Sequence, residues 1–146
     1  MAHDLYDRDF YLWTKAQAEA LRARSGNALD YDLLAEEIED MGKRDLRECS
    51  SRALQILIHL WKLASTQREA PKAHWRAEVR VQRRDLRSAL SPSLRRLLDL
   101  ELEALHVEAA EVAGDLVASE EPGVRIDASR RWTLEQILGE VDDPLG

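Results

Sequence analysis

Four carboxylates lie within one short stretch of the sequence, and carboxylates can bind metal ions or transfer protons. They are Glu36, Glu37, Glu39 and Asp40. On a helix Glu37 falls at the edge of the apolar face, where a carboxylate needs a charged or hydrogen-bonding partner. Glu37 could be a metal ligand or a general base. We favour a structural ion pair that joins two helices, with an arginine or the Trp75 indole as the partner.

A di-iron centre would suit an acidic helical protein, but its motifs are incomplete. Such a centre needs two inward-facing Glu-x-x-His motifs and two further glutamates. The chain has one such motif, from Glu103 to His106, and Glu103 lies on the wrong face of its predicted helix. The single cysteine, Cys49, excludes a multi-cysteine zinc site and is most simply a core residue. We find no nucleophile motif and no glycine-rich phosphate loop, so we expect no metal, no cofactor and no catalytic residue.

Aromatic and polar side chains are predicted to share one part of the core, as they do in ligand pockets. The candidate residues, for a pocket or for a structural polar core, are Trp13, Glu37, Trp75, Gln82 and Arg83. A solvent-open cavity there would favour a small-ligand-binding protein or an enzyme.

The elements that must position these residues are helices. Leucine and alanine are abundant and β-branched residues are few. The predicted helices cover residues of about 9–24, 30–65, 72–90, 92–118 and 133–139. We therefore predict an all-α fold, an antiparallel bundle of four main helices plus a short C-terminal helix, in a single domain over residues 1–146.

Local signals mark where these helices begin and end. Asp9 is expected to cap the first helix, and Gly26 to end it in a left-handed conformation. Gly42 either weakens the second helix or breaks it in two. Thr133 and Gln136 fit a capping box.

Apolar spacing predicts which helix faces are buried. Leu34, Ile38 and Met41 form the predicted inner stripe before Gly42. Residues 53–64 are apolar except for one polar stripe, which is typical of a central helix. In the fourth helix the predicted inner stripe comprises Leu98, Leu102, Leu105, Ala109, Val112 and Leu116.

Charge is divided unevenly along a chain of 28 acidic and 21 basic side chains, with a formal net charge of -7. Helix 72–90 carries a basic ridge of Lys72, Arg76, Arg80, Arg83 and Arg87. Such a ridge could contact nucleic-acid phosphates. It lies between acidic segments 30–48 and 99–121, so pairing inside the bundle is the preferred interpretation and nucleic acid is not the expected partner. The sequence shows no secretory signal and no membrane span, so we expect a cytoplasmic protein.

The fourth helix has a second apolar stripe opposite its inner one. Leu97, Leu100 and Val107 mark this candidate interface. Either residues 124–138 cover the stripe or a second copy of the chain does, and we hypothesise a homodimer.

Several sequence blocks together resemble a known family. They read YDRDFYLW at 6–13, LAEEIEDMG at 34–42, SPSLR at 91–95 and TLEQIL at 133–138. The chain is similar to the bacterial domain-of-unknown-function family 29. The resemblance implies a small all-helical bacterial protein and implies no activity. We therefore expect a non-enzymatic protein-interaction or self-association module, with the pocket protein described above as the alternative.

Overall fold

The computed structural model describes residues 2–142, with side chains from Asp4 onward, as two compact units that meet within one helix between Arg44 and Asp45. All regular structure in the described residues is helical, which confirms the predicted all-α class.

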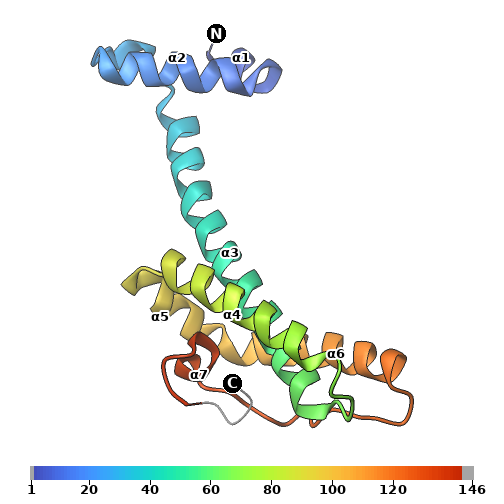
Figure 1. The fold of residues 1–146 in the computed structure, drawn as a ribbon. Coiled ribbons are helices and arrows are strands. Elements are labelled where there is room, and N and C mark those ends of the chain that lie inside the picture. The colour runs from blue at the N-terminus through green and yellow to red at the C-terminus, as the bar shows by residue number, and fades with distance from the viewer. Residues whose placement is uncertain (1, 143–146) are drawn as a thin grey trace. The chain divides into compact units, whose positions relative to one another are not determined.

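The N-terminal unit consists of three helical pieces and the first part of a long helix (Figure 1). They are α1 (Ala2–Arg8), α2 (Phe10–Arg22), the short 3-10 helix η1 (Gly26–Ala28) and the beginning of α3 (Tyr31–Ser65). The sequence predicts one helix from Asp9. Asp9 does cap α2, since its side chain accepts a hydrogen bond from the Leu12 amide at 3.1 Å. The additional helix α1 ends directly before this cap.

The end of α2 differs from the predicted glycine stop. The left-handed residue is Arg24, with φ of 55°, and not Gly26. Gly26 has another role, because a Cβ there would lie 3.0 Å from the Tyr31 hydroxyl oxygen. Glycine at this position therefore permits the close approach of the Tyr31 side chain, and it does not supply a left-handed backbone conformation.

The sequence left open whether Gly42 weakens its helix or breaks it in two. Helix α3 runs unbroken through the glycine, and a Cβ at that position would meet nothing within 4 Å. In the N-terminal unit Leu33 is buried, but Ile38 is 66% and Met41 59% exposed. The predicted inner stripe of this segment is thus wrong for Ile38 and Met41, which have no cover within their own unit.

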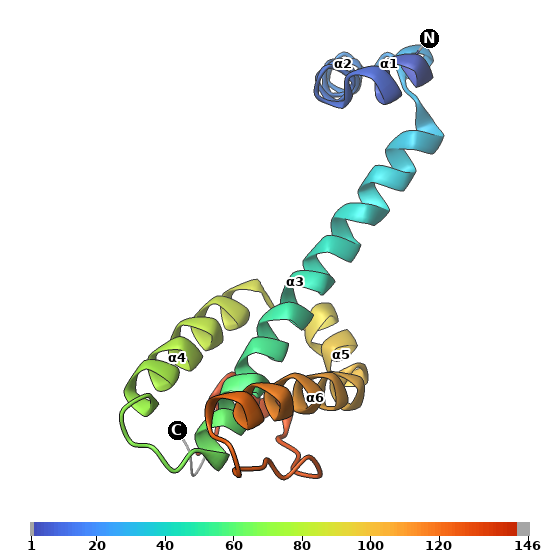
Figure 2. The same cartoon turned by 90° about the vertical axis from the view of Figure 1, so that its right-hand side faces the viewer.

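The C-terminal unit packs four further helices around the second part of α3. They are α4 (Lys72–Ala89), α5 (Pro92–Leu100), α6 (Leu102–Glu120) and α7 (Leu134–Leu138). Figure 2 shows α3 between α4 and α6. The central position predicted for residues 53–64 is confirmed, because Ala53, Ile56 and Leu57 are fully buried. Cys49 is also buried in this core.

The predicted fourth helix is two helices, α5 and α6, separated at Glu101. Their buried face is also rotated relative to the prediction beyond Ala109. Val112 and Leu116 are each 38% exposed, and Ala113 and Val117 are buried instead. A strict alternation of three and four residues drifts around a straight helix, so a stripe predicted from one end loses its register at the other.

The short helix α7 is fixed at both ends by local chemistry. Thr133 and Gln136 form the predicted capping box, with Thr133 Oγ1 accepting from the Gln136 amide at 3.1 Å. Gly139 ends the helix with φ of 72°, and a Cβ there would lie 2.9 Å from Arg83 Cδ. Both the left-handed backbone and the close arginine require glycine at this position.

Candidate functional site

An aromatic and acidic cluster forms the polar part of the N-terminal unit. The Tyr6 hydroxyl donates to Glu37 Oε1 at 2.5 Å, and the Tyr6 ring packs edge-on against Phe10 and Trp13. The hydrogen bond to Glu37, with desolvation and the negative charge of that carboxylate, raises the pKa of Tyr6 to about 12. Glu37 thus has the polar partner that its position requires, but the partner is Tyr6 rather than an arginine or the Trp75 indole.

The five candidate pocket residues are divided between the two units. Trp13 is buried and Glu37 half-buried in the N-terminal unit, whereas Trp75, Gln82 and Arg83 belong to the C-terminal unit. The latter three have separate local roles.

Trp75, Gln82 and Arg83 each contact a different part of the C-terminal unit. The buried Lys62 places its Nζ 4.4 Å from the Trp75 ring centroid in a cation–π contact. Gln82 Oε1 accepts from Arg52 at 3.2 Å. Arg83 donates to the backbone carbonyls of residues 136 and 137.

The acidic residues that the structure describes do not form a metal-binding group. Among the described residues, no group of three or more His, Cys, Asp or Glu side chains is placed to hold a metal ion. Glu36, Glu39 and Asp40 are exposed. Glu103 of the Glu-x-x-His motif forms a two-pronged ion pair with Arg131, at 3.0 and 2.9 Å.

His106, the other half of that motif, is a buried residue whose role the sequence did not reveal. It is 1% exposed, and its ring contacts the Trp61 ring edge-on and stacks with the Trp132 ring. Its Nε2 accepts from the Trp132 backbone amide at 3.0 Å, so the ring proton is on Nδ1, which donates to the Leu102 carbonyl at 2.8 Å. Burial lowers the pKa of His106. The neutral histidine on α6 therefore binds the segment that precedes α7 through the hydrogen bond from the Trp132 amide.

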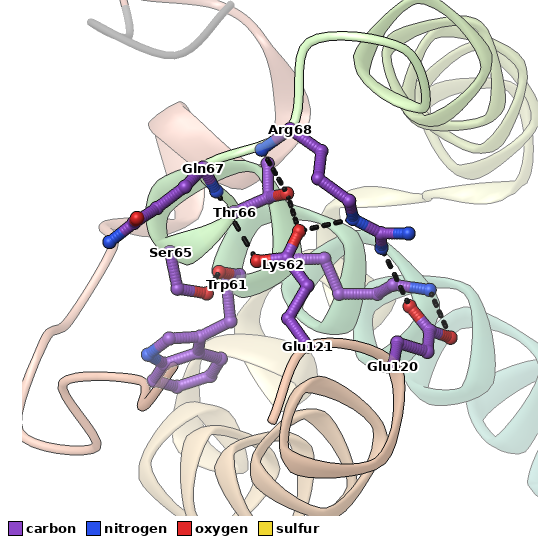
Figure 3. Close-up of polar contacts among 8 residues, drawn as sticks. All are labelled: Trp61, Lys62, Ser65, Thr66, Gln67, Arg68, Glu120 and Glu121. Atoms are coloured by element: carbon purple, nitrogen blue, oxygen red, sulfur yellow. Dashed lines mark hydrogen bonds and ion pairs between the residues drawn. The ribbon is translucent and has the colours of Figure 1, made fainter. Parts of the chain in front are cut away.

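A charged network joins the loop after α3 to the end of α6 (Figure 3). Glu121 accepts from Thr66 and Arg68, and Lys62 Nζ lies 3.3 Å from Glu120. These carboxylates stand at a helix C-terminus, where the dipole disfavours negative charge. The basic partners Lys62 and Arg68 offset this cost. The hydrogen bond from the Thr66 hydroxyl, followed by that from Arg68, lowers the pKa of Glu121.

The basic ridge of α4 has a different set of partners from the predicted acidic helices. Besides Arg83, Arg87 donates to the Leu138 carbonyl at 2.9 Å. Two arginines thus bind the carbonyls at the C-terminal end of α7, which carries a partial negative charge. A cavity of about 260 Å³ lies beside them, lined by four arginines of the ridge and by apolar side chains of α3 and α4.

The second apolar stripe is exposed along α5 and α6. Leu97, Leu100 and Val107 all have large exposed fractions, with Leu100 at 79%. Residues 124–138 do not cover the stripe, because Trp132, Leu134 and their neighbours pack into the core instead. The alternative in which residues 124–138 cover the stripe is therefore wrong, and the homodimer through this stripe stays a prediction.

The fold and its polar contacts define a small all-helical protein in two units. Comparison with protein families adds one finding. The model of the domain of unknown function DUF29 matches residues 5–141, so the chain belongs to this family. No curated protein and no solved structure matches the chain. No helix in the described part of the chain has the length and apolar character needed to cross a bilayer.

Proposed function

We propose that the protein is a non-enzymatic self-association module, in which the apolar surface of the N-terminal unit docks on the same surface of a second copy. The observation that carries this proposal is the number of large apolar side chains left exposed by so small a unit. They are Phe10, Tyr11, Leu12, Leu21, Tyr31, Ile38 and Met41.

The size of the unit explains why this surface favours a partner. The buried apolar residues of the unit are Trp13, Ala20 and Leu33. Helical units of about 40 residues rarely bury enough surface to be stable by themselves, and oligomerisation is one usual solution. Covering the exposed side chains would contribute about 25 cal/mol for each Å² removed from water.

The spacing along α3 favours a second copy of the same helix as the occupant. Tyr31, Leu34, Ile38 and Met41 follow steps of three and four residues, the spacing of a seam between two paired helices. In an antiparallel pair related by a two-fold axis, Ile38 of each copy can pack against Met41 of the other. This closed arrangement uses one surface twice and leaves no open end.

Charge along the same part of α3 favours the antiparallel direction. Residues 36–40 include four acids and no base, and Lys43 and Arg44 follow after Met41 and Gly42. With Ile38 opposite Met41, an antiparallel pair places Lys43 of each copy opposite Glu36 of the other. A parallel pair in register would place all four acids of one copy beside those of the other, whereas the antiparallel pair does this only for Glu39 and Asp40, so the antiparallel direction has less repulsion.

Light scattering coupled to size exclusion tests the proposal on the full chain. We expect the wild type to have twice the 16.7 kDa mass of one chain. The double variant Ile38→Lys, Met41→Lys should be monomeric and retain its helical circular dichroism, because both side chains are exposed. A wild type that stays monomeric at high concentration would overturn the proposal.

The stripe on α5 and α6 provides the matched control. Leu100→Lys places the same charge on the other exposed apolar surface and should leave the α3-mediated dimer intact. If Leu100→Lys dissociates the dimer and the α3 variant does not, the interface is the stripe of Leu97, Leu100 and Val107, and the α3 pairing is wrong.

A further inference from the structure

The arginine-lined cavity of the C-terminal unit has features that self-association does not use. It lies between α3, α4 and the end of α7, and its volume is about 260 Å³. Its guanidinium groups come from Arg76, Arg80, Arg83 and Arg87. Among the described residues that line it, none is acidic.

The four arginines fall into two pairs with different roles. Arg83 and Arg87 are held by the backbone carbonyls at the end of α7, at distances of 2.8 to 3.0 Å. This anchoring fixes one edge of the cavity. Arg76 and Arg80 are exposed and make no hydrogen bond or ion pair with any described residue. Their donors are therefore available at the opening.

The charge balance of α4 is unusual for this protein. The helix carries six basic and two acidic residues, in a chain whose formal net charge is -7. Guanidinium groups gathered on one helix face repel each other, and an anion placed among them relieves that repulsion while accepting strong charge-assisted hydrogen bonds.

The floor of the cavity is apolar. Leu63 of α3 and Val79 of α4 line it, and both are largely buried by the core beneath. A fully hydrated inorganic ion gains nothing from such a floor, whereas the hydrocarbon part of a larger molecule is removed from water there.

We propose that this cavity binds a small organic anion, with a carboxylate or phosphate head group and a short apolar body. The head group accepts hydrogen bonds from Arg76 and Arg80, and the body lies over Leu63 and Val79. The site is contained in the C-terminal unit and does not depend on the proposed pairing of α3.

Calorimetric titration of the full chain tests this site with four probes: octanoate, octyl phosphate, 1-octanol and inorganic phosphate. We expect octanoate or octyl phosphate to bind with a Kd of about 1 mM or tighter, and the tighter of the two identifies the head group. 1-Octanol and inorganic phosphate each lack one half of the recognised chemistry and should bind at least about tenfold more weakly. Absence of binding by both amphiphilic anions, or equal binding of inorganic phosphate, would overturn the proposal.

Single substitutions locate the site. Arg76→Gln and Arg80→Gln should each weaken binding by about tenfold, because each removes charge-assisted donors. Arg84→Gln is the matched control on the same helix, since Arg84 pairs with Asp85 at 3.1 Å and does not line the cavity. An equal loss in Arg84→Gln would show general charge attraction and refute the site. Light scattering on each variant keeps this result separate from self-association.

Discussion

At the scale of single residues, His106 shows how burial gives a side chain one protonation state. Both ring nitrogens are engaged, one as a donor to Leu102 and one as an acceptor from Trp132. A second proton would turn the accepting nitrogen into a donor that faces the Trp132 amide. The charged side chains that act on His106 are Arg131, which lowers its pKa, and Glu103, which raises it. Desolvation is the largest cause, so the net shift is downward.

This environment predicts a loss of stability in mild acid. The folded state resists a proton that the unfolded chain accepts below the ordinary pKa of 6.5. The contribution of His106 to stability is therefore constant above that pH and declines as the pH falls below it. We expect His106 to contribute a slope of at most about 1.4 kcal/mol per pH unit between pH 6.5 and its folded pKa. Urea unfolding of the wild type and of His106→Leu at several pH values measures this slope as the difference between them.

Leu105→Ala is the matched control for this prediction. Leu105 is buried on the same turn of α6, so its truncation should lower the free energy of unfolding by about 2–5 kcal/mol and keep the wild-type pH slope. A His106→Leu protein with the same pH slope as the wild type would contradict the assigned role.

At the scale of elements, the connection from α2 to α3 depends on one buried amide. Gln17 Nε2 donates to the Ala28 carbonyl at 3.2 Å, and its Oε1 accepts from the Asp30 amide at 2.8 Å. Gln17 is buried although its helix exposes most of its other polar residues. A single side chain thus satisfies two backbone groups that the turn leaves without partners.

Removing that amide should loosen the N-terminal unit. Gln17→Ala leaves a half-buried N–H and a carbonyl without their protein partners, and we expect it to destabilise the unit by about 1–3 kcal/mol. Thermal melting followed by circular dichroism should show a lower first transition. Gln55→Ala, at an exposed position of α3, should change stability by less than about 0.5 kcal/mol. Equal effects of the two substitutions would show that the Gln17 bridge is unimportant.

At the scale of the whole molecule, the two units differ greatly in the size of their cores. The connected core of buried residues lies entirely in the C-terminal unit and includes most of residues 53–63. The buried apolar side chains of the N-terminal unit are Trp13, Ala20 and Leu33. Local stability follows buried apolar contact, so the N-terminal unit should open more readily.

Hydrogen exchange followed by mass spectrometry can measure this difference along the chain. In the monomeric Ile38→Lys, Met41→Lys variant, we expect the amides of α2 to exchange at least about tenfold faster than those of residues 53–63. In the wild type at high concentration, pairing of the N-terminal unit should slow the exchange of α2. Equal protection of α2 and residues 53–63 in the monomer would contradict the difference in stability.

The sequence by itself determined the features that depend on neighbours along the chain. Composition and periodicity predicted an all-helical protein, and the caps at Asp9 and Thr133 lie where predicted, because a cap acts within three residues. The apolar run at 53–64 could only be a central helix. The blocks quoted from both ends of the chain indicated the family correctly.

The tertiary structure decided everything that depends on contacts between distant residues. Three sets of hydrogen bonds join residues that are 26 to 54 positions apart in the chain. They connect Tyr6 with Glu37, His106 with Trp132, and the α7 carbonyls with Arg83 and Arg87. Helical periodicity states which residues share a face, but not which face meets another helix and which remains exposed. For the same reason Ile38 and Met41 are predicted as core residues from their spacing, and only the packing of the unit shows that they are exposed.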